Sequence, residues 1–168
     1  MSVQITEVSG RKQLKRWIRF QHALYGGDSL FVPQLVSDEL DTFDPQRNPA
    51  FRVADVRFLL AERDGEPVGR VCGVIHHLEA DKVGHKRGRF GWYECIDDAA
   101  VSDAMLAHLE AWFRAEGCTE LAGPLGFTDL DPEGLLIDGN GALPTIAGSY
   151  HKPYYRGLLE GYGLAKVV

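Results

Sequence analysis

The chain has 168 residues, of which 45% are hydrophobic and 25% charged, and its formal net charge is −6. This is the composition of one ordinary globular domain, long enough to bury a core without disulfides or a structural metal. The acidic balance argues against a general nucleic-acid or acidic-membrane binder, because there is no excess of Lys and Arg to neutralise phosphates.

The first third of the sequence predicts a short strand followed by two helices. Residues 2–8 alternate loosely in polarity, and Ser9 offers an N-cap for a helix that Gly26-Gly27 would end. Larger side chains recur at helical spacing between these signals: Leu14, Trp17, Ile18, Gln21 and Tyr25. A second short helical stretch runs from Pro33 through Leu40.

The middle of the sequence predicts an antiparallel meander of three strands. Val56 to Glu62 and Val68 to Ile75 flank Asp64-Gly65, a tight-turn signal, so they form the clearest hairpin in the chain. The basic run from Lys82 to Arg89 is interpreted as a solvated loop. Phe90 to Ile96 is then the third strand.

The last third alternates helix and strand. A helix follows the third strand, with one apolar face: Val101, Met105, Leu109 and Trp112. Thr119 to Leu125 is the next strand, and the crossover helix allows it to lie parallel to the third. The long glycine- and proline-rich loop Gly126 to Ser149 is of a kind that often carries function. Tyr154 to Tyr162 predicts a final helix, and Ala165 to Val168 the start of another strand.

This order predicts a single α+β domain over residues 1–168. Its mixed sheet combines an antiparallel meander with a parallel strand after a crossover helix, and helices cover both faces.

Cysteine and histidine usage gives no sign of a metal. Cys72, Cys95 and Cys118 show neither zinc-type spacing nor the even count of a disulfide framework. The adjacent His76 and His77 would point to opposite faces of a strand. The sequence shows no signal peptide and no apolar run approaching ~20 residues. We therefore expect a reduced, cytoplasmic protein.

The segment ECIDDAAVSD, Glu94 to Asp103, joins the aromatic third strand directly to the next helix. A helix N-terminus in this position is well placed to hold a phosphate. Here the turn carries two adjacent acids, Asp97 and Asp98, each of which would cost ~1 kcal/mol beside a solvated pyrophosphate. Alternatively, Asp98 is simply the helix N-cap, which the helix dipole favours.

The order of elements resembles that of the GNAT superfamily of acyl-CoA-dependent N-acyltransferases. Four stretches are similar to the N-terminal part of a bacterial GNAT-like group with longer members: NPAFRVADVRFLLAERDGEPVGRVCGVIHH, KRGRFGWYECIDD, GPLGFTDLDPEGLLIDG and YHKPYYRGLLEGYG. They cover most of the chain. The resemblance implies a GNAT-like domain, either a short form or a fragment truncated at its C-terminal strands, but a shared fold does not fix function.

The GNAT resemblance also implies a cofactor loop. In GNAT enzymes backbone N–H groups of an Arg/Gln-x-x-Gly-x-Gly/Ala turn hold the pyrophosphate of acetyl-CoA, the co-substrate. Alignment on the helix places Asp97 at the Arg/Gln position, Ala100 at the first glycine and Ser102 at the second. The residues implied to bind the cofactor are Ile96, Asp97, Asp98, Ala100, Val101 and Ser102. Small residues are kept, but the charge at the first position is reversed.

Glu94 is the candidate general base. A period of two places four residues on one strand face: Phe90, Trp92, Glu94 and Ile96. Burial among aromatic rings would raise the pKa of this carboxyl, which suits a base near neutral pH. The resemblance implies the same role, since a glutamate on this strand deprotonates the acceptor amine in many GNAT enzymes. The alternative is an ion pair with Arg70 or Arg89 across the sheet.

The general acid that GNAT enzymes usually place on the last helix is missing at its expected position. It is a tyrosine four residues before a Gly-aromatic pair, and counting back from Gly163 reaches Leu159. Tyr155 and Tyr154 lie about one turn earlier and could substitute if the helix is displaced; otherwise they are packing residues. The glycine-rich loop adds two carboxylates that either face a pocket or are solvated: Glu133 and Asp138.

Two functions remain open at this point. The first is an N-acetyltransferase that uses acetyl-CoA and an unidentified amine, with no metal. The second is a non-catalytic GNAT-like module that binds a partner or another copy of itself. If Ala165 to Val168 begins an incomplete sheet edge, a homodimer or a swapped strand would cover that edge.

Overall fold

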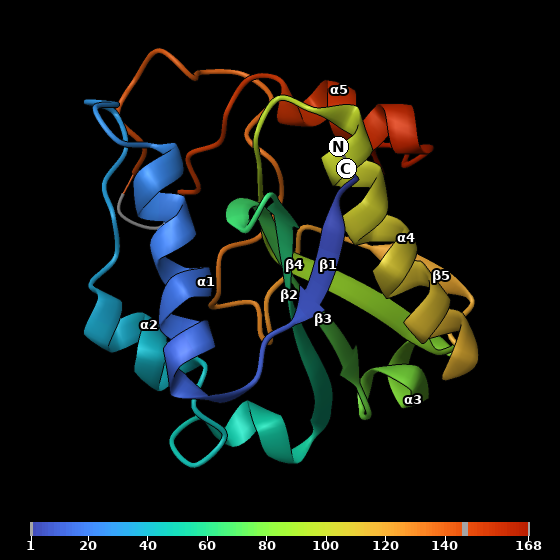
Figure 1. Cartoon of the computed structure of the whole chain (residues 1–168). Helices are drawn as coiled ribbons and strands as arrows, with labels where there is room; N and C mark the ends of the chain where they lie inside the picture. Colours follow the sequence, from blue (N-terminus) through green and yellow to red (C-terminus); the bar gives the residue numbers. More distant parts are fainter. Residues whose placement is uncertain (1, 146–147, 168) are drawn as a thin grey trace.

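The computed structural model describes residues 2–145 and 148–167, and a five-stranded sheet forms its centre (Figure 1). The strands follow chain order across the sheet: β1 (Gln4–Glu7), β2 (Ala54–Arg63), β3 (Glu66–His76), β4 (Arg87–Cys95) and β5 (Glu120–Ala122). The first four pair antiparallel, and β5 pairs parallel to β4. The predicted mixed α+β sheet is therefore confirmed.

Helices cover both faces of this sheet, as Figure 1 shows with α1 on one side and α4 on the other. Their bounds are α1 (Gly10–Leu24), α2 (Val36–Thr42), α3 (Glu79–Val83), α4 (Ala99–Ala115) and α5 (Tyr155–Tyr162), with a 3₁₀ turn η1 (Pro49–Arg52) before β2. The α1 and α2 helices pack on one face, and α4 and α5 on the other, so each face has its own core.

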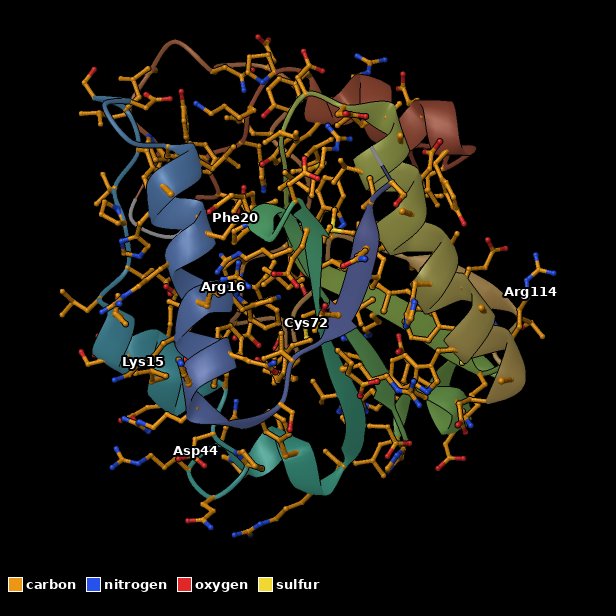
Figure 2. The ribbon with its side chains drawn as sticks, in the orientation of Figure 1. Lys15, Arg16, Phe20, Asp44, Cys72 and Arg114 are labelled. Atoms are coloured by element: carbon orange, nitrogen blue, oxygen red, sulfur yellow. The ribbon has the colours of Figure 1, made fainter. Side chains whose placement is uncertain are left out.

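The α4-side core consists of Leu59, Ala61, Val71, Ile75, Phe90, Tyr93, Cys95, Val101, Met105, Leu106, Leu109, Trp112, Phe113, Cys118, Tyr155, Leu158 and Leu159. The α1-side core consists of Trp17, Ile18, Leu40, Phe43, Ala54, Leu60, Cys72, Val74 and Phe127. Figure 2 shows Cys72 in the interior beside α1, whereas Arg114 projects outward from α4. Alternation along β2 and β3 divides the apolar side chains between these two cores.

The basic run differs from the prediction of a solvated loop. Arg87 and Arg89 belong to β4, and both contact the carboxylate of Glu79, at 3.1 and 2.8 Å. Glu79 begins the short helix α3, which the sequence pattern did not predict. The interpretation as a loop was wrong for these two arginines because an acidic partner eight to ten residues earlier neutralises them.

The C-terminal segment also differs. Residues 164–167 contain no strand in the described part of the chain, so the strand predicted from Ala165 is wrong there, and Val168 lies outside the described residues. Gly163 adopts a φ of 107°, and the Leu164 N–H donates to the carbonyl of Leu159. This left-handed turn folds the chain back along α5, which directs Leu164 onto the α4-side core.

Candidate functional site

An irregularity in β4 sets the direction of the side chains at its end. In the register of β3 and β4, Arg70 pairs with Glu94 and Cys72 with Gly91, so β4 contains one extra residue between these pairs. Trp92, within the bulge, has a φ of 46°, which is strained for a residue with a side chain. A bulge of this kind re-aims the residues that follow it.

The structure overturns the prediction that four residues at the end of this strand share a face. Phe90 belongs to the α4-side core and Ile96 packs against it. Trp92 packs against the α1-side core, and Glu94 accepts a hydrogen bond from α1. The inserted residue puts Phe90 on the opposite face from Trp92 and Glu94. Ile96 lies beyond the end of β4 at Cys95, where the period of two no longer applies.

A cavity of about 310 Å³ lies on the α1 side at this end of β4. Apart from Glu39 of α2, it is lined by α1, the connection between α1 and α2, the end of β4 and the long segment between β5 and α5. Residues from all four contribute to its wall, among them Gln21, Phe31, Trp92, Glu94, Asp131 and His151. The described parts of the segment from residue 123 to 154 contain no helix or strand, so this wall is built from loop.

Glu94 is 3% exposed and has two close hydrogen-bond donors. The Gln21 amide donates to Oε1 at 2.6 Å, and the Tyr155 hydroxyl donates to Oε2 at 2.6 Å. Burial raises the pKa of Glu94, and the charge of Arg70 together with these donors opposes that rise only in part. The carboxyl is therefore poised to exchange a proton, as a general base requires.

The two arginines proposed as ion-pair partners of Glu94 are engaged elsewhere. Arg89 contacts Glu79, and the fully buried Arg70 contacts Glu39 Oε1 at 3.5 Å. Arg70 also donates to the carbonyls of Trp17 and Ile18. It lies opposite Glu94 in the sheet and acts on it through its charge, while its ion pair is with α2.

Tyr155 and Glu94 are brought together although 61 residues separate them. Tyr155 is the first residue of α5, and its oxygen also accepts the N–H of Cys95 at 3.1 Å. Burial and the charge of Glu94 raise the pKa of Tyr155 well above its usual value, so this hydroxyl remains a donor. Tyr154 donates to the Cys95 carbonyl, and Leu159 is buried in the α4-side core.

The acidic turn before α4 satisfies its own backbone. Asp98 is the N-cap: its carboxylate accepts the Ala100 N–H at 2.9 Å, and its carbonyl accepts those of Val101 and Ser102. Arg63 contacts the same carboxylate at 2.8 Å and holds the pKa of Asp98 below its usual range.

The remaining residues of the implied cofactor loop also either form hydrogen bonds within the chain or carry an acidic side chain. The Ile96 N–H donates to Val68, the buried Ser102 hydroxyl accepts from Tyr93 at 2.8 Å, and Asp97 is exposed. The implied pyrophosphate site does not fit these residues, because its surface is acidic and most of its backbone donors are bonded within the chain: the N–H groups of Ile96, Asp98, Ala100, Val101 and Ser102.

Several residues of the cavity wall were missed or misplaced by sequence reasoning. Gln21 was noted only as part of a helical face, although a lone amide on such a face is a usable signal. His151 carried no local signal. The two loop carboxylates weighed as pocket residues, Glu133 and Asp138, are exposed, whereas Asp131 lines the cavity.

Within residues 2–145 and 148–167, no three His, Cys, Asp or Glu side chains gather as a metal site would require. None of the described helices is both long enough and apolar enough to span a bilayer.

Two curated proteins are similar to almost the whole chain. It is 32% identical over 166 residues to a bacterial ceramide synthase of Caulobacter vibrioides, with 98% of this chain and 43% of that protein covered. It is 29% identical over 156 residues to Protein YghO of Escherichia coli, with 93% of this chain and 40% of that protein covered. The chain thus spans less than half the length of these relatives. No protein-family model matches it.

Solved structures establish the fold. A tandem GNAT protein from the clavulanic acid biosynthesis pathway matches with a TM-score of 0.61 and 14% identity, over 96% of this chain and 43% of that one. AAC(6')-Iy in complex with a bisubstrate analogue, CoA-S-monomethyl-acetylneamine, matches with a TM-score of 0.59 and 12% identity, over 99% and 92%. The chain has the GNAT fold, as the order of its elements predicted. Sequence identities this low support an inference about the fold alone.

Proposed function

We propose that this chain is the acyltransferase part of a protein that transfers an acyl group from a thioester to an amine, with Glu94 as the general base. The observation that carries the proposal is the buried Glu94 at the cavity wall, where burial raises its pKa and Gln21 and Tyr155 fix both oxygens. The GNAT fold and the relative named as a ceramide synthase support an acyl-transfer reaction.

The proposed reaction forms a C–N bond and breaks a C–S bond. An acceptor that arrives as an ammonium ion first releases one proton to solvent. The neutral amine nitrogen then attacks the thioester carbonyl carbon, and Glu94 takes the second proton that the nitrogen loses. The thiolate leaves as the carbonyl re-forms, and the proton held by Glu94 passes to the sulfur, so the products are an amide and a thiol. Tyr155 stays protonated and orients the carboxylate throughout, because its raised pKa keeps it from acting as a base.

The chemistry of the cavity favours a cationic amine as acceptor. Glu39, Glu94 and Asp131 contribute carboxylates to its wall, and Phe31 and Trp92 contribute aromatic rings. Carboxylates and aromatic faces both attract an ammonium group. A ceramide is an amide of a long-chain amino alcohol, so the similarity to a ceramide synthase makes such an amino alcohol our preferred acceptor.

The acyl donor is proposed to be an acyl-CoA, by analogy with the GNAT fold and the CoA-containing analogue bound by AAC(6')-Iy. The misfit at the α4 turn leaves the nucleotide end of that donor without an assigned site. Acetyl-CoA and long-chain acyl-CoA are therefore equal candidates, and their comparison belongs to the test.

The test is a thermal-shift titration with acetyl-CoA and palmitoyl-CoA, because a ligand that binds the folded state raises the melting temperature by mass action. Thiol release is then measured with spermidine, neamine and sphinganine as acceptors. Amine-dependent release supports the proposal. If no donor raises the melting temperature and no pair of donor and acceptor releases thiol, the proposal is contradicted. That result favours the second function, a non-catalytic module that binds a partner or a second copy of the chain.

A further inference from the structure

We propose that His151 donates a hydrogen bond from Nε2–H to the oxygen of the reacting carbonyl, a role that rests on the proposed acyl transfer. In this role His151 would stabilise the negative charge that develops on that oxygen when the amine attacks. Donors aimed at such an oxygen are usually the largest single contribution to catalysis of acyl transfer.

His151 lines the same cavity as Glu94 and is 9% exposed. Its ring centre lies 5.9 Å from that of Tyr155, whose hydroxyl donates to Glu94. The proposed donor, His151, and the proposed base, Glu94, therefore line the same cavity. A reaction between a carbonyl and an attacking amine requires both groups in one site.

The hydrogen bonds of the ring fix which nitrogen carries the proton. His151 Nδ1 accepts the backbone N–H of Leu136 at 3.1 Å, so Nδ1 is unprotonated and Nε2 carries the hydrogen. Burial lowers the pKa of His151 to about 4, which keeps the ring neutral near pH 7. A neutral ring in this tautomer donates from Nε2 and neither repels a cationic amine nor competes with Glu94 for its proton.

The backbone around His151 is anchored from both sides. The Asn140 side chain donates to the His151 carbonyl at 2.8 Å. The neighbouring Tyr150 hydroxyl and Lys152 ammonium both contact Asp28, each at 3.1 Å, in the connection between α1 and α2. Although it belongs to a loop, the imidazole is held in position, as a preorganised donor must be.

Other donors near Glu94 are already used. The Cys95 N–H donates to Tyr155 and the Ile96 N–H to Val68, while the Gln21 amide and the Tyr155 hydroxyl donate to Glu94 itself. A carbonyl placed beside Glu94 therefore needs a donor from elsewhere in the cavity wall, and His151, which lines the same cavity, supplies one.

Electron movement at this donor is balanced. Attack by nitrogen forms the C–N bond and moves the carbonyl π pair onto oxygen, where the Nε2–H bond stabilises it. The pair returns as the C–S bond breaks, and His151 keeps its proton in every step.

The first test uses S-(2-oxopropyl)-coenzyme A, an unreactive ketone analogue of acetyl-CoA, and NMR of the imidazole N–H groups. Binding is expected to move the Nε2–H resonance of His151 downfield, and His76, which is half-buried at the far end of β3, serves as the internal reference. Binding without any change at His151 overturns the inference alone. No binding of this analogue and no turnover of any thioester overturn the proposed function, and this inference with it.

The second test compares His151→Phe, which keeps a ring but no donor, with His151→Gln, which keeps an N–H. His151→Phe is expected to lower kcat by about 10²–10³-fold with little change in KM, as removal of one such donor does, and His151→Gln to restore part of it. The matched control, His76→Phe, should retain kcat. An active enzyme whose kcat survives His151→Phe overturns the inference, and if that variant fails to fold, the NMR result on the unmodified chain decides.

Discussion

Glu94 and Asp98 lie at the two ends of the turn between β4 and α4, yet their surroundings push their pKa values in opposite directions. Asp98 contacts Arg63 and the Ala100 N–H and is easily ionised. Glu94 is buried, and the loss of water raises its pKa. When two carboxyls in one region differ in this way, the one with the raised pKa is the candidate for proton transfer.

The two regions also differ in how completely they satisfy their polar groups. The α4 N-terminus uses its own aspartate to cap the helix. On the cavity side, Nε and Nη2 of the buried Arg70 and Oε2 of Glu39 find no hydrogen-bond partner among the described residues, and at the α4 turn Nε of Arg63 is in the same state. Buried polar groups of this kind are costly for structure alone, so the cavity side is where we expect chemistry and the α4 turn is where we expect stability.

The largest expected effect is that of Glu94→Gln. Loss of the base should lower the rate of thioester-to-amine transfer by about 10²–10⁴-fold, while the near-isosteric amide leaves the melting temperature almost unchanged. The transfer rate and the melting temperature are measured on the same preparation. The control is Glu79→Gln, which leaves Arg89 without its carboxylate and Arg87 with that of Glu120 alone, and which should lower stability without a specific loss of activity. The opposite pattern, a destabilised Glu94→Gln, would mean that Glu94 is structural.

The next effect concerns His151 and pH. Its pKa falls from 6.5 to about 4 on folding, so between these values the unfolded state binds more protons than the folded state. The contribution of the neutral ring is therefore fully present above about pH 6.5 and is lost as pH falls toward 4, by about 3 kcal/mol. Urea unfolding at pH 7.5 and pH 4.5 measures it. His151→Gln should lose less stability over this interval than the unmodified chain, and equal losses would contradict the assignment.

A smaller effect, on stability alone, is expected from changes to Asp98 in the turn before α4. Asp98→Ala removes the N-cap of α4 and should cost about 1–2 kcal/mol of unfolding free energy. Asp98→Asn keeps a capping oxygen and should cost less, since only the contact with Arg63 is weakened. Denaturant unfolding of the two variants separates the contribution of the N-cap hydrogen bond from that of the charged contact with Arg63. If Asp98→Ala instead abolishes activity at full stability, the turn is part of the active site.

The smallest effect is that of Asp97→Arg, which restores the charge that GNAT enzymes place at this position. We expect acetyl-CoA to bind about fivefold more tightly, equivalent to ~1 kcal/mol, and the gain to shrink as salt increases. Calorimetric titration at two salt concentrations measures it, with Asp129→Arg as a control at another exposed aspartate. An unchanged affinity would show that the nucleotide does not approach this turn.

Sequence reasoning succeeded where the signal is local. The Asp64-Gly65 turn fixed the β2–β3 hairpin, and Gly26-Gly27 marked the end of α1. The N-cap interpretation of Asp98 agrees with the structure for the same reason, because a cap joins residues only two apart. Sequence reasoning failed at the β4 bulge, although Gly91, directly before Trp92, is the kind of residue that marks an inserted position inside a strand.

Local signals in the sequence thus specify the order of the elements, the mixed sheet and the acidic character of the α4 turn, because turns, caps and periodicity act over a few residues. The tertiary structure places one carboxylate in the interior, brings one tyrosine to it and puts one histidine in the wall of the same cavity. Glu94 meets Gln21 across 73 residues and Tyr155 across 61, and the bulge decides the face on which they meet. Contacts at that separation depend on how whole elements pack, and burial, which sets the pKa of Glu94 and of His151, exists only once they have packed.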